Sequence, residues 1–208
     1  MGKMSERKKL SYLAGITDMR GYFYFNKEKS LFKILFYFSE KDRDVANKVR
    51  KELQDRFNIP SSIYEYRKEQ LELVITNLSN IKRFLSLILP YSLKKAHIRK
   101  AKELGVEVEK KEIDVLSYLK AVVELMAFIR YKKKEGQYNI RINFTEREND
   151  LFENIKSLFE DLGFEVNVYT ARRKRGNFKE KQLYIGRKKQ VLKFLSIFNL
   201  EGWYGVNM

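Results

Sequence analysis

Apolar and polar side chains alternate along several short stretches of the chain, and this alternation predicts β-strands. In FKILFYFSE (32–40) and in YNIRINFTE (138–146), every second residue is apolar, so one face of each strand should pack on a core. The opposite face of the second stretch carries polar residues: Asn139, Arg141, Asn143 and Thr145. With their neighbours, these patterns predict four hairpins, with strands at 22–27 and 32–39, 62–67 and 71–76, 128–133 and 138–145, and 166–172 and 181–186.

Apolar residues at helical spacing predict helices around these hairpins. Ser39 with Asp42, and Thr145 with Glu148, have the spacing of a capping box, which marks the start of a helix. The expected helices cover about 5–20, 41–57, 78–92, 113–127, 147–162 and 188–198. The coarse order is therefore αββαββα, twice.

The same letters also occur twice. LSYL stands at 10–13 and again at 116–119, and the 106-residue offset continues through FSEKD (38–42) opposite FTERE (144–148). An ordered series of matches along both halves indicates an internal duplication. We expect a first half at 1–93, a charged and partly helical connector at 94–112, and a second half at 113–208.

The net charge of the chain bears on its function. The 208 residues contain 43 Lys and Arg against 27 Asp and Glu, a net charge of +16, and the pI is about 9.8. Such an imbalance is typical of a nucleic-acid binder. A Lys- and Glu-rich surface of a heat-adapted protein would explain the high charged fraction but not the imbalance.

Several chemistries are disfavoured by composition. The chain has no cysteine and one histidine, His97, which argues against disulfides, thiolate or His-based zinc sites and Ser–His–Asp catalysis. We interpret His97 as a surface or helix-packing residue. No run of eighteen apolar residues predicts a membrane span, and the first ten residues lack the apolar stretch of a secretory signal. We expect a cytoplasmic protein, nucleoid- or ribosome-associated, and the composition suggests a thermophilic archaeon.

A family resemblance rests on LAGITDMRGYFYF (13–25) and on LKAVVELMA (119–127). The first stretch resembles the signature of the LAGLIDADG homing endonucleases and keeps Leu13, Ala14, Gly15, Asp18 and Gly21. The second keeps only Leu119 and a carboxylate, Glu124. With the duplication, the likeness covers about 5–200 and is similar to the single-chain, pseudo-two-fold form of that family.

The resemblance implies an α+β fold of two pseudo-symmetric halves, each with a four-stranded antiparallel, saddle-shaped sheet that straddles the major groove of duplex DNA. The two motif helices would pack on each other at the pseudo-dyad. The residues expected at this interface are Leu13, Ala14, Gly15, Leu119, Ala121 and Val122.

In the family, the eighth letter of each motif is the acid that binds a divalent metal at the scissile phosphate. Here these letters are Arg20 and Met126, which do not offer the hard oxygen ligands that such an ion prefers. Asp18 and Glu124 stand two residues earlier, about 200° around the helix, and should instead cap or brace it. We therefore predict no metal, no cofactor and no enzymatic activity, with Arg20 contacting phosphate directly.

The candidate binding residues come from four places: the expected open faces of the sheets, the end of the first motif helix, the basic pair after the last helix of the first half, and the tip TARRKRGNFKEKQ (170–182). Arg, Asn and Gln on such a face can read base edges. The full set is Arg20, Tyr22, Tyr24, Asn26, Lys33, Tyr37, Tyr64, Tyr66, Lys94, Lys95, Arg130, Lys132, Asn139, Arg141, Asn143, Asn167, Tyr169, Arg172, Arg173, Lys174, Arg175, Lys179, Gln182 and Tyr184.

Three hypotheses follow. The first is a non-cleaving protein that binds duplex DNA in the saddle as a monomer. The second is an RNA-binding protein, maturase-like or ribosome-associated, supported by the tyrosine-rich face of the first half, since bases stack on aromatic rings. The third is a weakly active DNA endonuclease. The same tyrosine face would also suit a protein partner.

Overall fold

The computed structural model describes residues 5–67, 69–132, 137–145, 148–172 and 179–200. The chain divides into two compact units, Met1–Ala121 and Val122–Met208. Within these described ranges, no helix is long and apolar enough to cross a membrane. The halves and connector expected from the sequence remain a prediction.

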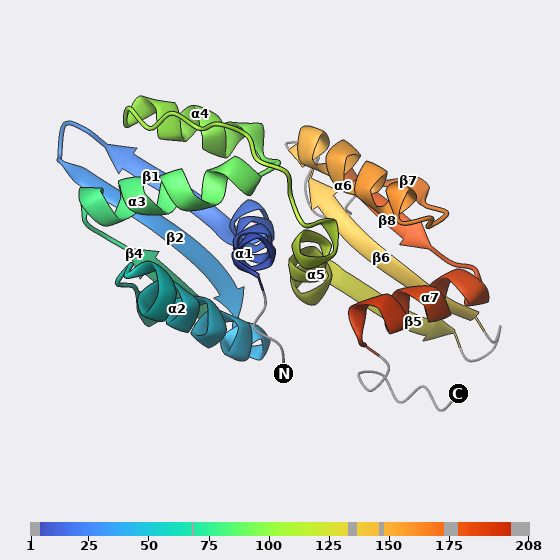
Figure 1. Ribbon diagram of the computed structural model, residues 1–208. Coiled ribbons are helices and arrows are strands. Elements are labelled where there is room, and N and C mark those ends of the chain that lie inside the picture. The colour runs from blue at the N-terminus through green and yellow to red at the C-terminus, as the bar shows by residue number, and fades with distance from the viewer. Residues whose placement is uncertain (1–4, 68, 133–136, 146–147, 173–178, 201–208) are drawn as a thin grey trace. The chain divides into compact units, whose positions relative to one another are not determined.

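Unit 1 contains one four-stranded antiparallel sheet in the order β1-β2-β4-β3. Its helices lie against one face of this sheet, and no described helix covers the other face (Figure 1). The elements are α1 (Glu6–Arg20), β1 (Gly21–Asn26), β2 (Leu31–Ser39), a 3-10 turn (Glu40–Asp42), α2 (Arg43–Phe57), β3 (Ser62–Arg67), β4 (Gln70–Ile75), α3 (Leu78–Ile88), a second 3-10 turn (Leu89–Tyr91), α4 (Lys95–Glu103) and the first seven residues of α5 (Val115–Met126).

Unit 2 repeats this topology, with strand order β5-β6-β8-β7. Its elements are the end of α5, β5 (Ala127–Lys132), β6 (Gln137–Thr145), α6 (Asn149–Asp161), β7 (Asn167–Arg172), β8 (Lys179–Ile185) and α7 (Lys188–Phe198). The predicted α+β class, the two four-stranded antiparallel sheets and the repeated order of elements are therefore confirmed.

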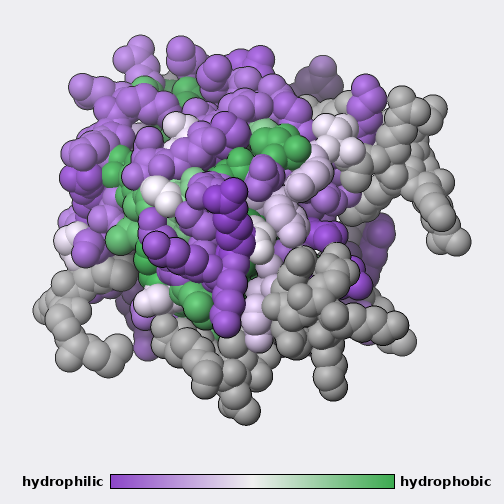
Figure 2. Space-filling model, turned by 90° about the vertical axis from the view of Figure 1, so that its right-hand side faces the viewer, coloured by the Kyte–Doolittle hydropathy of each residue, from purple (hydrophilic) through white to green (hydrophobic). Residues whose placement is uncertain are grey.

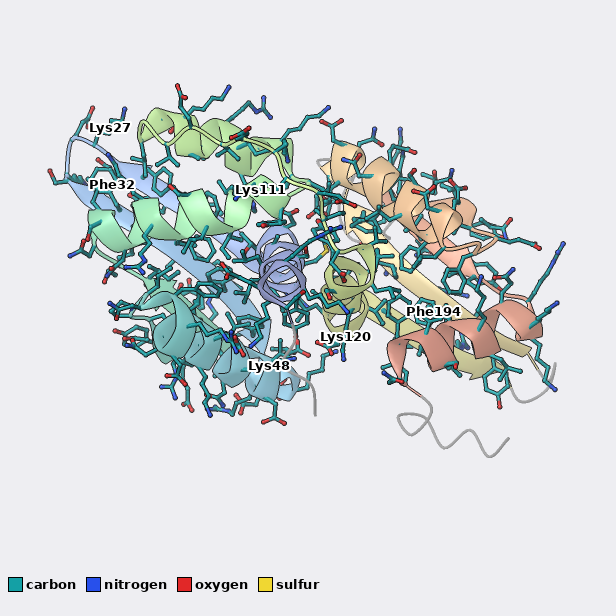
Figure 3. The ribbon with its side chains drawn as sticks, in the orientation of Figure 1. Lys27, Phe32, Lys48, Lys111, Lys120 and Phe194 are labelled. Atoms are coloured by element: carbon teal, nitrogen blue, oxygen red, sulfur yellow. The ribbon has the colours of Figure 1, made fainter. Side chains whose placement is uncertain are left out.

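The two units bury different cores beneath their sheets. In unit 1, every residue of α1 from Leu10 to Asp18 is buried, so this stretch of the motif helix has no solvent-facing side. In unit 2, α6 and α7 meet through aromatic rings. Phe194, labelled in Figure 3, lies 6.0 Å from Phe159 and 4.7 Å from Phe198, measured between ring centroids. These contacts pack α6 and α7 against each other.

The motif helix approaches α5 closely at Gly15. A Cβ atom at this position would lie 2.7 Å from the carbonyl oxygen of Tyr118 and 2.9 Å from the Cβ of Ala121, both within unit 1. Only glycine permits this approach without a shift of the backbone. Nearby, Lys48 of α2 lies over the ring of Tyr12, 4.3 Å from its centroid (Figure 3).

The third helix ends earlier than the sequence predicts. Helix α3 ends at Ile88, because Pro90 cannot continue the α-helical hydrogen bonds and the chain tightens into a 3-10 turn. The segment after it packs onto unit 1: the ring of His97 in α4 stacks on Phe23 of β1, 4.3 Å between centroids, and is buried. The helix-packing interpretation of His97 is therefore confirmed.

Figure 2 shows one side of the molecule, where hydrophilic side chains predominate.

Candidate nucleic-acid interface

The open face of the unit 1 sheet is rich in tyrosine. Strand pairing places Tyr22 opposite Leu35 and Tyr24 opposite Lys33, and places Tyr37 and Tyr64 on either side of Glu72. The most exposed rings are those of Tyr22 and Tyr64, at 55% and 56%. The predicted clustering of Tyr22, Tyr24, Lys33, Tyr37, Tyr64 and Tyr66 on one sheet is present in this structure, and Asn26 stands at the end of β1.

Tyr37 interacts with two neighbours on this face, Glu72 and Tyr66. The pKa of the Tyr37 hydroxyl is raised above its ordinary value by partial burial and by the nearby carboxylate of Glu72. The Tyr66 ring lies 5.9 Å from that of Tyr37, and the guanidinium of Arg67 lies 5.0 Å from the Tyr66 centroid. This face therefore combines aromatic rings with one acid and flanking cations.

The open face of the unit 2 sheet carries polar groups at the matching positions. One row across the sheet contains Phe128, Arg141, Tyr184 and Asn167, and the next contains Asn143, Gln182 and Tyr169. The guanidinium of Arg141 lies 5.9 Å from the Tyr184 centroid, and the rings of Tyr169 and Tyr184 meet edge to face at 5.3 Å. Phe128, 60% exposed, was not among the predicted residues, although it stands 106 positions after Tyr22.

One prediction on this face was wrong in its detail. Asn139 was expected to face solvent. It pairs with Arg130 at the register expected for the open face, but only 1% of it is exposed. Neither polar atom of its amide has a hydrogen-bond partner among the described residues, and the same holds for Nε of Arg141 and Oδ1 of Asn143. Strand alternation specifies the face of a residue but not what covers it.

The basic tip cannot be assigned in this structure. Arg173, Lys174 and Arg175 lie outside the described residues, as do the side chains of Lys132 and Arg172. Of the remaining predicted cations, Lys179 is exposed at the start of β8, and Arg130 is exposed on β5.

Asp18, near the end of α1, is completely buried and highly connected. Its Oδ1 accepts a hydrogen bond from Ser92, and its Oδ2 accepts bonds from the Tyr118 hydroxyl at 2.6 Å and the Leu93 backbone N–H at 2.7 Å. The Nδ1 of His97 lies 3.4 Å from Oδ1. Asp18 thus ties α1 to the segment before α4 and to α5, consistent with the bracing role expected from its position.

Burial by itself would raise the pKa of the Asp18 carboxyl, but its neighbours outweigh this effect. The imidazole of His97 and the hydroxyls of Ser92 and Tyr118 favour the carboxylate, so its pKa lies below the ordinary value. Burial and the charge of Asp18 together raise the pKa of Tyr118 well above its ordinary value. The pair therefore exists as carboxylate and neutral phenol.

Arg20, the last residue of α1, lies two positions beyond Asp18 and at the edge of the unit. Its guanidinium is 3.8 Å from Oδ2 of Asp42, and 26% of its side chain is exposed. Ser39 also donates to that carboxylate, at 2.6 Å, so the predicted capping pair is used to anchor Arg20 as well. The Nζ of Lys94 donates to the backbone carbonyl of Asp18 at 3.0 Å, and Lys95 is exposed.

The last residues of the two motif helices are not carboxylates. Arg20 and Met126 end α1 and α5, and neither supplies an oxygen ligand. Both carboxylate oxygens of Asp18 are engaged inside unit 1. Among the described residues, no group of three or more His, Cys, Asp or Glu side chains is placed to hold a metal ion.

Comparison with known proteins bears on this geometry. The family described as LAGLIDADG-like domain matches residues 7–89. A search of curated proteins finds no match. The structure resembles that of the LAGLIDADG homing endonuclease I-GzeII in complex with its DNA target, with a TM-score of 0.64 and 12% identity, over 93% of this chain and 84% of that one.

Two further solved structures extend the comparison. A variant of I-DmoI in complex with nicked target DNA has a TM-score of 0.61 and 13% identity, over 94% of this chain and 98% of that one. The N-terminal LAGLIDADG domain of DUF199/WhiA has a TM-score of 0.53 and 17% identity, over 95% and 86%. The expected resemblance is confirmed: the chain carries a LAGLIDADG-like domain, has the fold of the LAGLIDADG homing endonucleases, and its two halves fit a duplicated form.

Proposed function

From this LAGLIDADG-like domain and fold, we propose that the protein binds duplex DNA through the open faces of its two sheets and does not cleave it. The net charge of +16 supports phosphate binding by either type of nucleic acid. Duplex DNA is favoured because relatives of the same fold, I-GzeII and I-DmoI, were solved with their DNA targets.

One observation carries the binding part of the proposal. On β6, Asn139, Arg141 and Asn143 each have a buried polar atom without a hydrogen-bond partner among the described residues. Unsatisfied buried polar groups are costly and rare, so three at alternate positions of one strand call for an explanation. A base edge provides one for the partly exposed Arg141 and Asn143, because Arg pairs with guanine and Asn with adenine in the major groove, whereas Asn139 is too deeply buried to be reached.

From the residues that end the two motif helices, we infer that the protein does not cleave DNA. Arg20 and Met126 replace the acids that the family resemblance leads one to expect, and Asp18 is held in a buried network. The residues present do not fit a divalent cation, so we derive no hydrolytic step. Arg20 instead provides a cation at the end of the motif helix for a phosphate oxygen.

RNA is the second candidate. It is favoured by the exposed rings of the unit 1 sheet, because single-stranded RNA is recognised largely through stacking. A weakly active endonuclease is the third, and it rests only on the activity named for the related structures. We further propose that the protein works as a monomer, which light scattering of the free and DNA-bound protein would test.

Two experiments test the function. Crosslinking in the native cells, followed by sequencing of the bound nucleic acid, should return recurring DNA sites, whereas reads dominated by structured RNA would overturn the duplex assignment. Recovered sites should then be incubated with the purified protein and Mg²⁺ or Mn²⁺. We expect stable complexes and intact strands. Cleaved or nicked product that persists in a repurified preparation would contradict the proposal of a non-cleaving protein.

Arg141→Met and Asn143→Leu provide matched variants for the binding assay. Both remove the hydrogen-bonding groups of a side chain on the open face and keep an unbranched or isosterically branched apolar chain of comparable length. A bidentate contact between a side chain and a base contributes about 1–3 kcal/mol of discrimination. Each variant should therefore relax the sequence preference at one or two positions of the site and leave non-specific affinity nearly unchanged.

A further inference from the structure

The two open sheet faces carry different chemistry at matching positions. Where unit 2 has Arg141 and Tyr184 in adjacent strands, unit 1 has Leu35 and Val74. Where unit 2 has Asn143 and Gln182, unit 1 has Tyr37 and Glu72. At these positions the unit 1 face therefore lacks the Arg, Asn and Gln side chains of unit 2, and it presents five exposed tyrosines: Tyr22, Tyr24, Tyr37, Tyr64 and Tyr66.

The spacing of these rings suits bases that have left the stack. Tyr22 and Tyr24 are alternate residues of β1, so their side chains leave the same face about 6.4–6.8 Å apart. Successive bases are spaced about 3.4 Å along a strand, so a single base fits between two such rings with van der Waals contact on both sides. A base inside a duplex is already stacked on both sides and gains nothing from this arrangement.

Glu72 supports the same conclusion. Glu72 stands between Tyr37 and Tyr64 in the strand register, and its carboxylate raises the pKa of Tyr37. A carboxylate in the middle of a face that covers duplex phosphates would be repelled by them. It can accept from the N4 amino group of cytosine, and an unpaired cytosine leaves both N–H groups of that amine free, whereas a paired cytosine leaves one.

Cations stand next to the rings, where the backbone of a bound strand requires them. Lys33 is paired with Tyr24, and the guanidinium of Arg67 lies over Tyr66 at 5.0 Å. Rings flanked by cations are how proteins bind single strands with little sequence preference. A protein partner would use the tyrosines as well, but it would not call for a cation beside each aromatic pair in a chain of net charge +16.

We propose that the unit 1 face binds an unpaired segment of DNA that adjoins the duplex held by the protein, so that the preferred substrate is a fork, flap or bubble rather than a fully paired site. The tyrosines stack on the unpaired bases, and Lys33 and Arg67 neutralise their phosphates. This inference rests on the proposed function and specifies its substrate class.

The test compares affinities of the full chain for blunt duplexes and for forks that carry single-stranded arms of about 4 to 12 nucleotides. An RNA counterpart of each fork is included. We expect the forks to bind on the order of tenfold more tightly than the blunt duplex. 2-Aminopurine placed in the arm should lose fluorescence on binding, because its ring stacks on tyrosine.

Two kinds of tyrosine variant distinguish the stacking of an aromatic ring from the effect of side-chain size. Tyr22→Leu and Tyr64→Leu should abolish the preference for forks, whereas Tyr22→Phe and Tyr64→Phe should retain it. Both residues are more than half exposed, so the fold should tolerate these changes. Arg141→Met on the other sheet should leave the ratio of fork affinity to blunt-duplex affinity unchanged.

Each outcome has one meaning. Equal affinity for forks and blunt duplexes, unchanged by the tyrosine variants, would overturn the inference and leave duplex binding intact. Tighter binding of the RNA counterparts would overturn the assignment to DNA. Binding to none of these nucleic acids would overturn the inference and the proposed function together.

Discussion

The hydroxyl of Tyr118 donates a 2.6 Å hydrogen bond to Oδ2 of Asp18, and neither residue has any exposed surface. The bond joins the motif helix α1 to the start of α5 across 100 positions of sequence. At the helix end where a catalytic acid is expected from the family resemblance, the nearest carboxylate of α1 is thus used to hold the fold together.

Tyr118→Phe tests the contribution of this bond. The variant keeps the ring and removes only the hydroxyl, so Asp18 loses one partner for its buried negative charge. A hydrogen bond to a charged group contributes about 1.5–3 kcal/mol, and we expect the free energy of unfolding to fall by about this amount. Urea denaturation measures it.

Tyr91→Phe is the matched control, because Tyr91 is also buried and its hydroxyl makes no hydrogen bond to a described residue. It should change stability by no more than a few tenths of a kcal/mol. Equal losses in the two variants would show that the Asp18 bond contributes nothing specific.

The lowered pKa of Asp18 predicts a dependence of stability on pH. The folded carboxyl binds a proton less readily than the unfolded one, whose ordinary pKa is 3.8. Its contribution is therefore fully present above pH 3.8 and is lost as the pH falls through the lower folded value. Urea midpoints between pH 7 and pH 2.5 should fall steeply in the acid range.

Asp18→Asn removes this titration and leaves an amide N–H₂ facing donors from Ser92, Leu93 and Tyr118. We expect a stability lower by about 3–5 kcal/mol at neutral pH, because the buried donors lose a partner. Its urea midpoint should also decline less steeply below pH 4. A variant that keeps the full acid dependence would place its origin in other carboxylates.

The repeat and the strand pattern were enough to predict the elements, because each depends on neighbouring letters. The alternation in 32–39 and 138–145 placed β2 and β6 within a residue of their observed bounds. The 106-residue offset predicted that both units share one topology, as they do.

The environment of Asp18 could not be predicted in the same way. Its partners Ser92 and Tyr118 stand 74 and 100 positions away, and no local pattern connects them. For the same reason, the burial of Asn139 was missed, since alternation says which face a side chain occupies and not what lies over it. The packing of His97 on Phe23 likewise depends on a tertiary contact.

Gly15→Ala tests the close approach of α1 and α5. An added methyl in an ordinary helix stabilises by about 0.5–1 kcal/mol, but here it would lie 2.7 Å from the Tyr118 carbonyl oxygen. We expect a net loss of about 1–3 kcal/mol, measured by thermal or urea unfolding. Ala121→Gly in the same chain removes the second clash and should restore part of the loss. Strictly additive effects would argue against direct contact.

Arg20 and Asp42 allow the phosphate contact to be measured. If Arg20 neutralises one phosphate, Arg20→Gln should lower DNA affinity and reduce the slope of log K against log salt by about 1. Asp42→Asn should act in the opposite direction, because it removes the carboxylate 3.8 Å from the guanidinium and leaves the cation to the phosphate. Lys82→Gln, on the exposed surface of α3, serves as a charge-matched control. Fluorescence anisotropy from 50 to 300 mM salt gives the three slopes. An unchanged slope for Arg20→Gln would place this side chain outside the contact with DNA and leave it a structural partner of Asp42.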